Sequence, residues 1–285
     1  MRMHRHGSSG PPIIVLHGGP GAPGSACGLA RGLAAAFRVH EPFQRGSTRP
    51  DGTVGTVTAE PLTVARHVAD LDALVAEITA GEGGLRPALV GHSWGAMLAL
   101  AYAAAHPGQV TALVAVGSGT FGPAARSRFN ELCAERMDDA LRERLRALET
   151  AVSDPDQRLR MRADLLEPLY SYDAMADEDA EPCDERAHRE TWDDMLRLQA
   201  AGVYPAAFAA IDVPVLLLHG AQDPHPGHLI RASLEPYLPA LEYREWERCG
   251  HYPWRERAVR DDFFAVASTW LRRRFASPRP EPGGG

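Results

Sequence analysis

The chain alternates between short unbroken apolar runs and longer segments in which apolar residues follow a helical spacing. The unbroken runs, each typical of a strand buried on both faces, are "IIVL" (13–16), "ALVGHS" (88–93), "VTALVAVGS" (110–118) and "VPVLLLHG" (213–220). Between the first two runs, residues 62–80 predict a helix whose apolar face carries Val64, Val68, Leu71, Val75 and Ile78. This alternation predicts an α/β fold with a mostly parallel central sheet flanked by helices.

The pattern changes between residues 121 and 210, where Arg, Asp and Glu are frequent and helical runs such as "RSRFNELCAERM" replace the strands. We call residues 121–210 the cap segment. An insertion between two parallel strands lies over the strand ends, where open α/β sheets bind ligands. We therefore expect a core made of residues 1–120 and 211–275 and a helical cap or lid made of residues 121–210.

The last part of the chain predicts one more strand and loop in "LEYREWERCGHYPW" (241–254) and a closing helix over residues 257–275. The apolar residues expected to point inward from that helix are Val259, Phe263, Trp270 and Leu271. Residues 276–285, "ASPRPEPGGG", have the composition of a disordered tail.

Composition narrows the function classes. The formal net charge is −7 with acids and bases interspersed, so nucleic acid is not an expected partner. Cys27, Cys133, Cys183 and Cys249 show no metal-finger spacing and are expected to be free thiols. No apolar stretch approaches the roughly 18 residues of a membrane span, and no signal peptide is recognisable. We expect a cytoplasmic protein without a membrane partner, a metal or a cofactor.

The sequence "GHSWG" (91–95) is a G-x-S-x-G motif between a predicted strand and a predicted helix. In that context it predicts a nucleophile elbow, a tight turn at which side chains on Gly91 and Gly95 would collide with the backbone. The N-terminus of the following helix favours developing negative charge near the serine. Ser93 is therefore the candidate nucleophile.

A serine nucleophile needs a base and an acid. His251 follows the last predicted strand and Asp223 follows "VPVLLLHG", which gives the chain order Ser, Asp, His known from α/β-hydrolases. His251 would take the proton from Ser93, and Asp223 would hold the imidazole tautomer. We expect His225 and His228 to be loop residues at the cap edge, and a metal-ligand interpretation of "HGAQDPHPGH" is the weaker one.

The loop "HGGPG" (17–21) indicates an oxyanion hole, because backbone without side chains can approach a substrate closely. The expected donors are the backbone N–H groups of Gly19 and Trp94. The Trp94 side chain is then free to form a wall of the pocket, and Gly18 is a further candidate for substrate binding. The loop matches neither phosphate-binding glycine motif.

Four sequences in this order, "HGGPG", "GHSWGAMLALAYAAAHPGQV", "VPVLLLHGAQD" and "CGHYPW", resemble the proline iminopeptidase-like branch of the α/β-hydrolases. The resemblance covers most of residues 12–120 and 210–274. It implies an α/β-hydrolase fold with an inserted helical cap and the release of an N-terminal aminoacyl group from a small molecule or short peptide. It also implies cap glutamates that hold the free amino terminus, for which Glu167 and Glu190 are candidates, with Tyr252 as another candidate substrate contact; Glu178, Glu181 and Glu185 are also available.

The sequence departs from the family at "PFQRGSTRP" (42–50), where a run resembling "DQRGSGRS" is usual. Phe43 stands in place of an acid, and Thr48 in place of a glycine. Ahead of "IIVL" we expect at most one short strand instead of a hairpin.

Three functions remain open from the sequence. The first is a serine hydrolase that releases an N-terminal aminoacyl group through a Ser-His-Asp acyl-enzyme mechanism. The second is an esterase, lactonase or natural-product amide hydrolase that needs no free amine. The third is a ligand-binding protein that keeps the fold without catalysis. The sequence indicates no oligomeric state.

Overall fold

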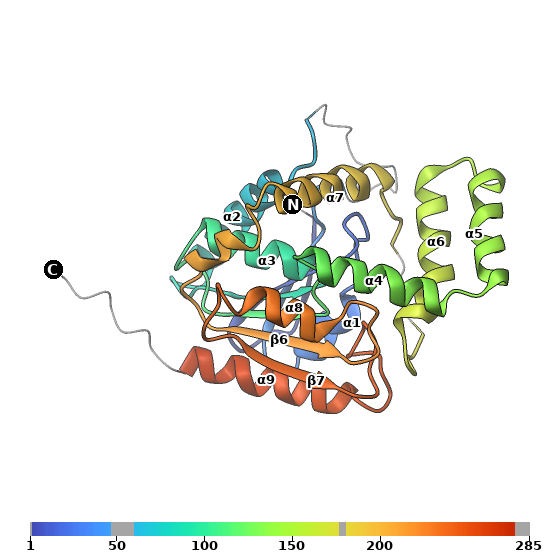
Figure 1. The fold of residues 1–285 in the computed structure, drawn as a ribbon. Helices are drawn as coiled ribbons and strands as arrows, with labels where there is room; N and C mark the ends of the chain where they lie inside the picture. Colours follow the sequence, from blue (N-terminus) through green and yellow to red (C-terminus); the bar gives the residue numbers. More distant parts are fainter. Residues whose placement is uncertain (1, 47–59, 177–180, 277–285) are drawn as a thin grey trace.

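A seven-stranded sheet forms the centre of the fold in the computed structural model, which describes residues 2–46, 60–176 and 181–276 (Figure 1). The strands are β1 (Met3–His6), β2 (Pro12–Leu16), β3 (Arg38–Pro42), β4 (Ala88–His92), β5 (Leu113–Val116), β6 (Val215–Gly220) and β7 (Glu242–Trp246). Their order in the sheet is β1-β3-β2-β4-β5-β6-β7. Only β1 pairs antiparallel with its neighbour among these strands, which confirms the expected α/β fold class.

Helices cover both faces of the sheet (Figure 1). One face packs against α1 (Cys27–Leu33) and α9 (Arg260–Ala276), and the other packs against α2 (Val64–Gly81), α3 (Trp94–Ala105) and α8 (Gly227–Leu234). Along β2, Ile13 and Val15 face the first layer while Ile14 and Leu16 face the second. Because both faces are buried, the strand reads as an unbroken apolar run.

Local chemistry sets the ends of the predicted elements. The α2 helix begins at Val64 because Thr63 caps it: the threonine side chain accepts a hydrogen bond from the Arg66 N–H at 3.2 Å. The β5 strand ends at Val116, since Gly117 has a φ of 51° and leaves the extended conformation.

The cap segment lies between β5 and β6 in the chain and contains α4 (Pro123–Arg136), α5 (Asp139–Ala151), α6 (Pro155–Tyr170), α7 (Glu185–Ala200) and η1 (Ala206–Ala210). Helices α5 and α6 lie side by side and extend to the right in Figure 1. Helix α7 packs on α2, where buried His67 donates from Nε2 to Thr191 Oγ1 at 2.9 Å. The division of the chain into core and cap remains a prediction.

The first strand and the closing helix agree with the elements predicted for the two ends of the chain. The single strand β1 precedes β2, and the closing helix α9 buries Phe263, Trp270 and Leu271 and reaches Ala276. Thr48 and the remainder of the expected tail, residues 277–285, lie outside the described residues. None of the helices in the described ranges combines the length and apolar content that a membrane span requires.

Candidate active site

Ser93 forms the turn between the last residue of β4 and the first residue of α3. Its φ is 54°, and it is the one non-glycine residue with a positive φ in the described part of the chain. Such a conformation stores about 1–3 kcal/mol of strain and is typical of functional sites. The Ser93 N–H donates to the Val116 carbonyl at 2.9 Å, which fixes the turn to the end of the neighbouring strand.

The two glycines of the motif have no room for a side chain. A Cβ on Gly91 would lie 2.2 Å from the carbonyl oxygen of Gly95, and a Cβ on Gly95 would lie 2.2 Å from the carbonyl oxygen of Leu16. The elbow therefore requires glycine at both positions, and α3 can begin directly behind Ser93.

Asp223 and His251 meet at the carboxyl ends of β6 and β7. Nδ1 of His251 donates to Oδ2 of Asp223 at 2.6 Å, and both side chains are buried. His92, directly before Ser93, donates from Nε2 to the His251 carbonyl at 3.1 Å, and the two imidazole rings lie 4.6 Å apart. The fold thus brings the predicted acid and base together beside the predicted nucleophile.

The hydrogen bonds also fix the protonation of His251. Because its Nδ1–H is donated to the carboxylate, Nε2 carries the lone pair and can act as the base. Burial lowers the pKa of His251, and the Asp223 charge opposes that shift. Burial also holds the pKa of His92 well below its usual range, so His92 remains a neutral donor.

Asp223 is surrounded by three imidazoles. Besides His251, His225 donates to Oδ1 from both Nδ1 (2.9 Å) and its backbone N–H (2.8 Å), and Nε2 of His219 lies 3.3 Å from Oδ2. Burial alone would raise the pKa of Asp223, but attraction by His251, His225 and His219 outweighs it and keeps the pKa well below its usual range. The carboxylate stays ionised.

His225 also packs against the base. Its ring stacks on His251 with centroids 4.8 Å apart and on Phe129 of α4 with centroids 4.4 Å apart. The sequence predicts His225 as a loop residue at the cap edge, and the structure adds its contact with Asp223. A histidine two residues after an aspartate at a strand end was the available signal, because such an aspartate accepts hydrogen bonds from the turn that follows it.

Asp223, His225 and His251 each bring a possible ligand atom within 4.8 Å of the others. In the observed arrangement, however, both Nδ1–H groups point at the carboxylate. This donor set fits proton transfer better than metal binding. His228, which was also expected in a loop, lies instead in the first turn of α8, because that helix begins at Gly227; it is exposed and lies outside the group.

The "HGGPG" loop lies directly against the elbow. A Cβ on Gly18 would approach the Ser93 Cβ to 3.1 Å, and Gly19 has a φ of 101°. His17 donates from Nδ1 to the Gly18 carbonyl at 2.9 Å and accepts the Gln44 N–H at Nε2. Burial lowers the pKa of His17 to about 4, so it serves these bonds as a neutral ring.

Trp94 is buried, with 1% of its surface exposed. Its Nε1 donates to Oε1 of Gln44 at 2.7 Å, and Nε2 of Gln44 donates to the His17 carbonyl at 2.9 Å. Through Gln44, the Trp94 indole thereby connects the elbow to the "HGGPG" loop. Its role as a pocket wall stays a prediction.

Phe43 and Arg45, in the segment that departs from the family motif, each have defined contacts in the structure. Phe43 is buried and meets the His4 ring edge-on at 4.8 Å, so the apolar residue in place of an acid covers β1. Arg45 forms two hydrogen bonds of 2.6 Å with the Asp70 carboxylate on α2. These contacts hold Gln44 between β3 and the elbow.

Helix α7 of the cap segment is hydrogen-bonded to the "HGGPG" loop. The His188 ring is hydrogen-bonded at Nδ1 to the carbonyls of Gly19 and Pro20, and the Asp184 N–H donates to the Gly21 carbonyl at 2.9 Å. The sequence carried no signal for these contacts, because they join residues more than 160 positions apart.

Glu256 joins the cap segment to the His251 loop. Its carboxylate is fully buried and accepts the N–H groups of Tyr172 (2.9 Å), Asp173 (2.7 Å) and Gly250 (2.9 Å). Next to it, the His251 N–H donates to the Tyr170 carbonyl at the end of α6 at 2.7 Å. The position of His251 therefore depends on the cap segment, a dependence that no pattern in the sequence predicts.

The cap glutamates considered for amine binding are paired with arginines. Glu167 meets Arg255 at 2.6 Å, and Glu190 meets Arg186 at 2.7 Å while accepting the Leu62 N–H at 3.0 Å. The hydrogen bond from Arg186 keeps the pKa of Glu190 below its usual value. The remaining described ion pairs of this group are Arg2–Glu181 and Arg189–Glu185. Glu178 lies outside the described residues.

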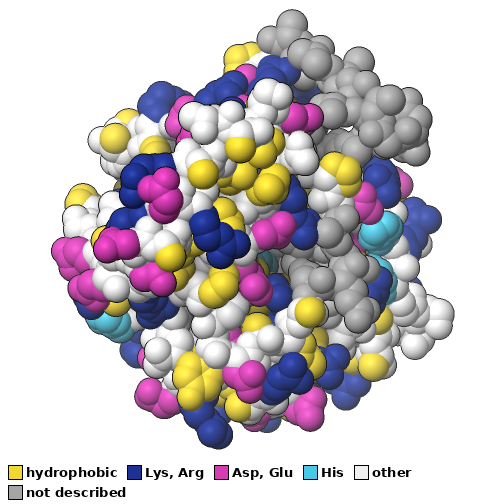
Figure 2. Space-filling model, turned by 90° about the vertical axis from the view of Figure 1, so that its right-hand side faces the viewer, with side chains coloured by type: hydrophobic (Ala, Val, Ile, Leu, Met, Phe, Trp, Pro, Cys, Tyr) yellow, Lys and Arg dark blue, Asp and Glu magenta, His cyan; other side chains and the backbone are white. Residues whose placement is uncertain are grey.

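Two further observations concern the surface around the site. Figure 2 shows acidic and basic side chains interspersed over the face that carries α5 and α6, in keeping with these ion pairs. Tyr252, the other candidate substrate contact, lies with its ring 5.1 Å from His251 and 5.2 Å from His92. It is therefore close to the base.

Known proteins share both sequence and fold with this chain. A "Probable proline iminopeptidase" of Streptomyces coelicolor is 41% identical over 115 residues, which are 39% of this chain and 34% of that protein. The chain thus matches about a third of the length of this curated relative. Among solved structures, a proline iminopeptidase from Mycobacterium smegmatis has a TM-score of 0.60 at 18% identity, covering 95% of this chain and 94% of that one.

A thermophilic esterase from Thermogutta terrifontis gives a TM-score of 0.61 at 18% identity, covering 96% of this chain and 93% of the esterase. At these identities the structural likeness concerns the fold, and it confirms the α/β-hydrolase architecture. A model of the alpha/beta hydrolase family matches residues 13–265, which is most of the sequence. The chain therefore belongs to the alpha/beta hydrolase family.

Proposed function

We propose that this protein is a serine hydrolase that cleaves a small amide or ester through an acyl-enzyme. The observation that carries the proposal is the 2.6 Å hydrogen bond between buried Asp223 and His251, next to a serine in a strained elbow. A nucleophile, a base with a free lone pair at Nε2 and an ionised orienting carboxylate are the parts that acyl transfer needs.

The mechanism follows from the positions of these groups. Nε2 of His251 takes the hydroxyl proton while Ser93 Oγ attacks the substrate carbonyl, and Asp223 stabilises the imidazolium. The backbone N–H groups of Gly19 and Trp94 hold the developing oxyanion. The imidazolium then gives its proton to the leaving amine or alcohol, and an ester remains on Ser93. Water, deprotonated by His251, attacks this ester and releases the acid.

For the substrate, we propose an N-terminal aminoacyl group as the first candidate. The names of the curated relatives and the family resemblance carried by "HGGPG" and "GHSWG" in this chain support it. A second candidate is an ester or lactone without a free amine. The ion pairs of the described cap glutamates favour this second candidate, because an incoming ammonium group would have to displace an arginine.

The decisive measurement is kcat/KM for prolyl-p-nitroanilide against its N-acetylated counterpart, with p-nitrophenyl acetate as a test of Ser93 itself. A large preference for the free amine supports the aminoacyl proposal. Ester turnover with neither anilide cleaved supports the second candidate. The Ser93→Ala variant is expected to lose each activity that the wild type shows by about 10⁴-fold or more. Full turnover by that folded variant would contradict the serine mechanism.

Glutamate variants then test how an amine is recognised. If Glu167 binds the ammonium group, Glu167→Gln raises KM for prolyl-p-nitroanilide about tenfold or more and leaves p-nitrophenyl acetate turnover unchanged. Glu143→Gln, in an exposed ion pair with Arg146 on α5, is the matched control. Equal effects on both substrates would assign Glu167 a structural role.

A further inference from the structure

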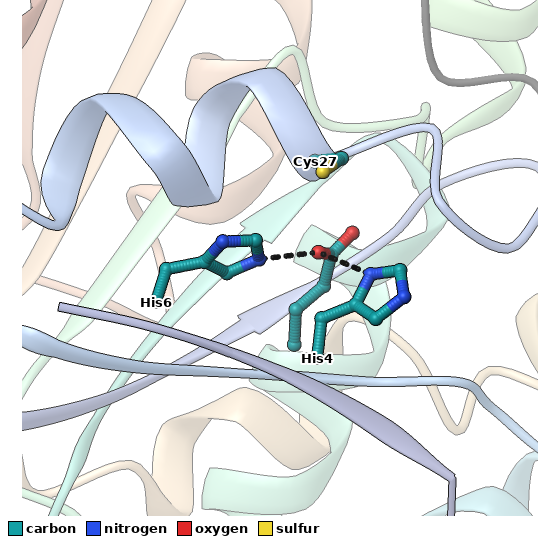
Figure 3. A group of neighbouring side chains, drawn as sticks. His4, His6 and Cys27 are labelled. Carbon is teal, nitrogen blue, oxygen red and sulfur yellow. Dashed lines mark hydrogen bonds and ion pairs between the residues drawn. The ribbon is translucent and has the colours of Figure 1, made fainter.

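A second group of polar side chains lies far from Ser93 in the sequence and is not used by the mechanism. His4 and His6 of β1, Glu41 of β3 and Cys27 at the start of α1 each bring one possible ligand atom to within 4.8 Å of the others. Figure 3 shows the rings of His4 and His6 turned toward one carboxylate, with Cys27 entering from the helix. That carboxylate belongs to Glu41, whose Oε2 lies 3.1 Å from His6 Nε2 and 3.5 Å from His4 Nδ1.

Strand register explains why these residues converge. In the antiparallel pair β1–β3, His4 lies directly opposite Glu41. Side chains two residues apart on a strand share a face, so His6 points to the same side as His4. Helix α1 covers this face, and its first residue places the Cys27 sulfur there. Side chains from three separate elements, β1, β3 and α1, therefore converge on one point.

The chemistry and spacing of this group match a metal site. Two imidazoles, one thiolate and one carboxylate are all ligands of zinc, and in a tetrahedral zinc site neighbouring ligand atoms are about 3.5 Å apart. The two ligand-to-ligand distances of 3.1 and 3.5 Å already have that size. One thiolate and one carboxylate also balance the charge of a divalent cation, which suits a site where Glu41 and Cys27 are 1% and 3% exposed.

We propose that His4, His6, Cys27 and Glu41 bind a zinc-type divalent cation with a structural role. The cation would fasten the edge strand β1 to α1, the helix that follows the oxyanion loop. His4, with 37% of its side chain exposed, provides the route from solvent. The site is separate from Asp223 and His251, and it stands whether or not the protein hydrolyses esters or amides.

The test is zinc binding by the full chain after removal of metals, measured by competition with a chromogenic chelator. We expect one equivalent with a dissociation constant below about 1 μM. The double variant His4→Ala/Cys27→Ala is expected to bind at least 100-fold more weakly. Matched controls are Arg5→Ala, on the exposed face of the same strand, and Cys133→Ala on α4. Both controls are expected to bind like the wild type.

Cobalt and thermal unfolding identify the ligands and the role. Cobalt(II) bound by the wild type is expected to show a thiolate charge-transfer band, which Cys27→Ala removes and Cys133→Ala retains. Saturating zinc is expected to raise Tm by about 5 °C in the wild type and not in the double variant. If the double variant does not fold, zinc binding is compared between the wild type and His4→Ala. This single change disturbs the fold least, because His4 is the most exposed of the four side chains. No stoichiometric binding, or equal affinity in the ligand variants, overturns the proposal.

Discussion

At the scale of single residues, the site places strain and charge where the proposed reaction needs them. Ser93 combines a side chain with a φ of 54°, a backbone conformation that glycine adopts more easily. Asp223 keeps its charge although it is buried, because three imidazoles surround it. The backbone strain at Ser93 and the buried charge of Asp223 each cost stability, and each fixes the geometry of the site. Each can be tested by one substitution.

The strain at Ser93 predicts a difference between two inactive variants. Ser93→Ala removes the hydroxyl and retains the Cβ, whereas Ser93→Gly also removes the strain. We expect Ser93→Gly to be more stable than Ser93→Ala by about 1 kcal/mol, the relief of strain being partly offset by the larger entropy of the unfolded chain. Urea unfolding of the two variants measures this difference, and a less stable glycine variant would contradict the assignment of strain.

The contact of His225 with Asp223 predicts a change in the pH profile. Because burial lowers the pKa of His251 below 6.5, activity of the wild type should fall on the acid side of that value. His225 also lowers the pKa of His251. His225→Phe keeps an aromatic ring in the stack but removes this effect of the imidazole and its hydrogen bond, so the acid limb of kcat/KM should move to higher pH.

The same His225→Phe variant should lose roughly tenfold in kcat, the effect of about 1.4 kcal/mol from one orienting hydrogen bond. His228→Phe, at an exposed position in the first turn of α8, is the control and should keep the wild-type profile. An unchanged pH profile in His225→Phe would show that His225 only fills space.

At the scale of elements, the cap segment and the core together position His251, the proposed base. The end of α6 and the His251 loop are connected through the Glu256 carboxylate and the Tyr170 carbonyl. Helix α7 holds the "HGGPG" loop through hydrogen bonds of His188. Changes in the cap segment should therefore alter the catalytic geometry as well as substrate access.

Glu256→Gln tests this connection. A glutamine turns one acceptor oxygen into an N–H donor that faces backbone N–H groups, so about 3 kcal/mol of stability should be lost. We also expect a lower kcat with little change in KM, since His251 loses its support. Thermal unfolding and steady-state kinetics measure the two effects, with exposed Glu247→Gln as the control. Wild-type stability and kcat in Glu256→Gln would refute the connection.

At the scale of the whole molecule, buried neutral histidines make stability depend on pH. Burial lowers the pKa of His17 and of His67 from 6.5 to about 4. Between these values the unfolded chain binds protons that the folded protein does not bind. The free energy of unfolding should therefore fall as the pH decreases from 6.5 to 4.

His67→Gln can keep a donor near Thr191 and removes one titrating group. The slope of unfolding free energy against pH in this range should become shallower by up to about 1.4 kcal/mol per pH unit. Urea unfolding at several pH values gives the slope. Leu85→Gln, at an exposed position, should keep the wild-type slope. The same slope in both variants would mean that folding does not lower the pKa of His67.

The sequence by itself determined the fold class and the order of the elements. Apolar runs such as residues 13–16 had to be strands buried on both faces, and residues 62–80 repeated the helical period over five turns. The G-x-S-x-G motif could be interpreted because it stands between a predicted strand and a predicted helix. The clash that excludes a side chain at Gly91 is local to the motif, whereas the clash at Gly95 is with the Leu16 carbonyl on another strand. Asp223 and His251 could be chosen because strand ends of a parallel sheet meet at one edge.

Only the tertiary structure decided which side chains meet across long sequence distances. The Glu256 connection to the cap segment, the Gln44 contact of Trp94 and the group formed by His4, His6, Cys27 and Glu41 all depend on how separate elements pack. No spacing in the sequence encodes such a contact, because its partners are brought together by strand register and helix packing. Local periodicity therefore specified the elements, and packing specified the electrostatics around the site.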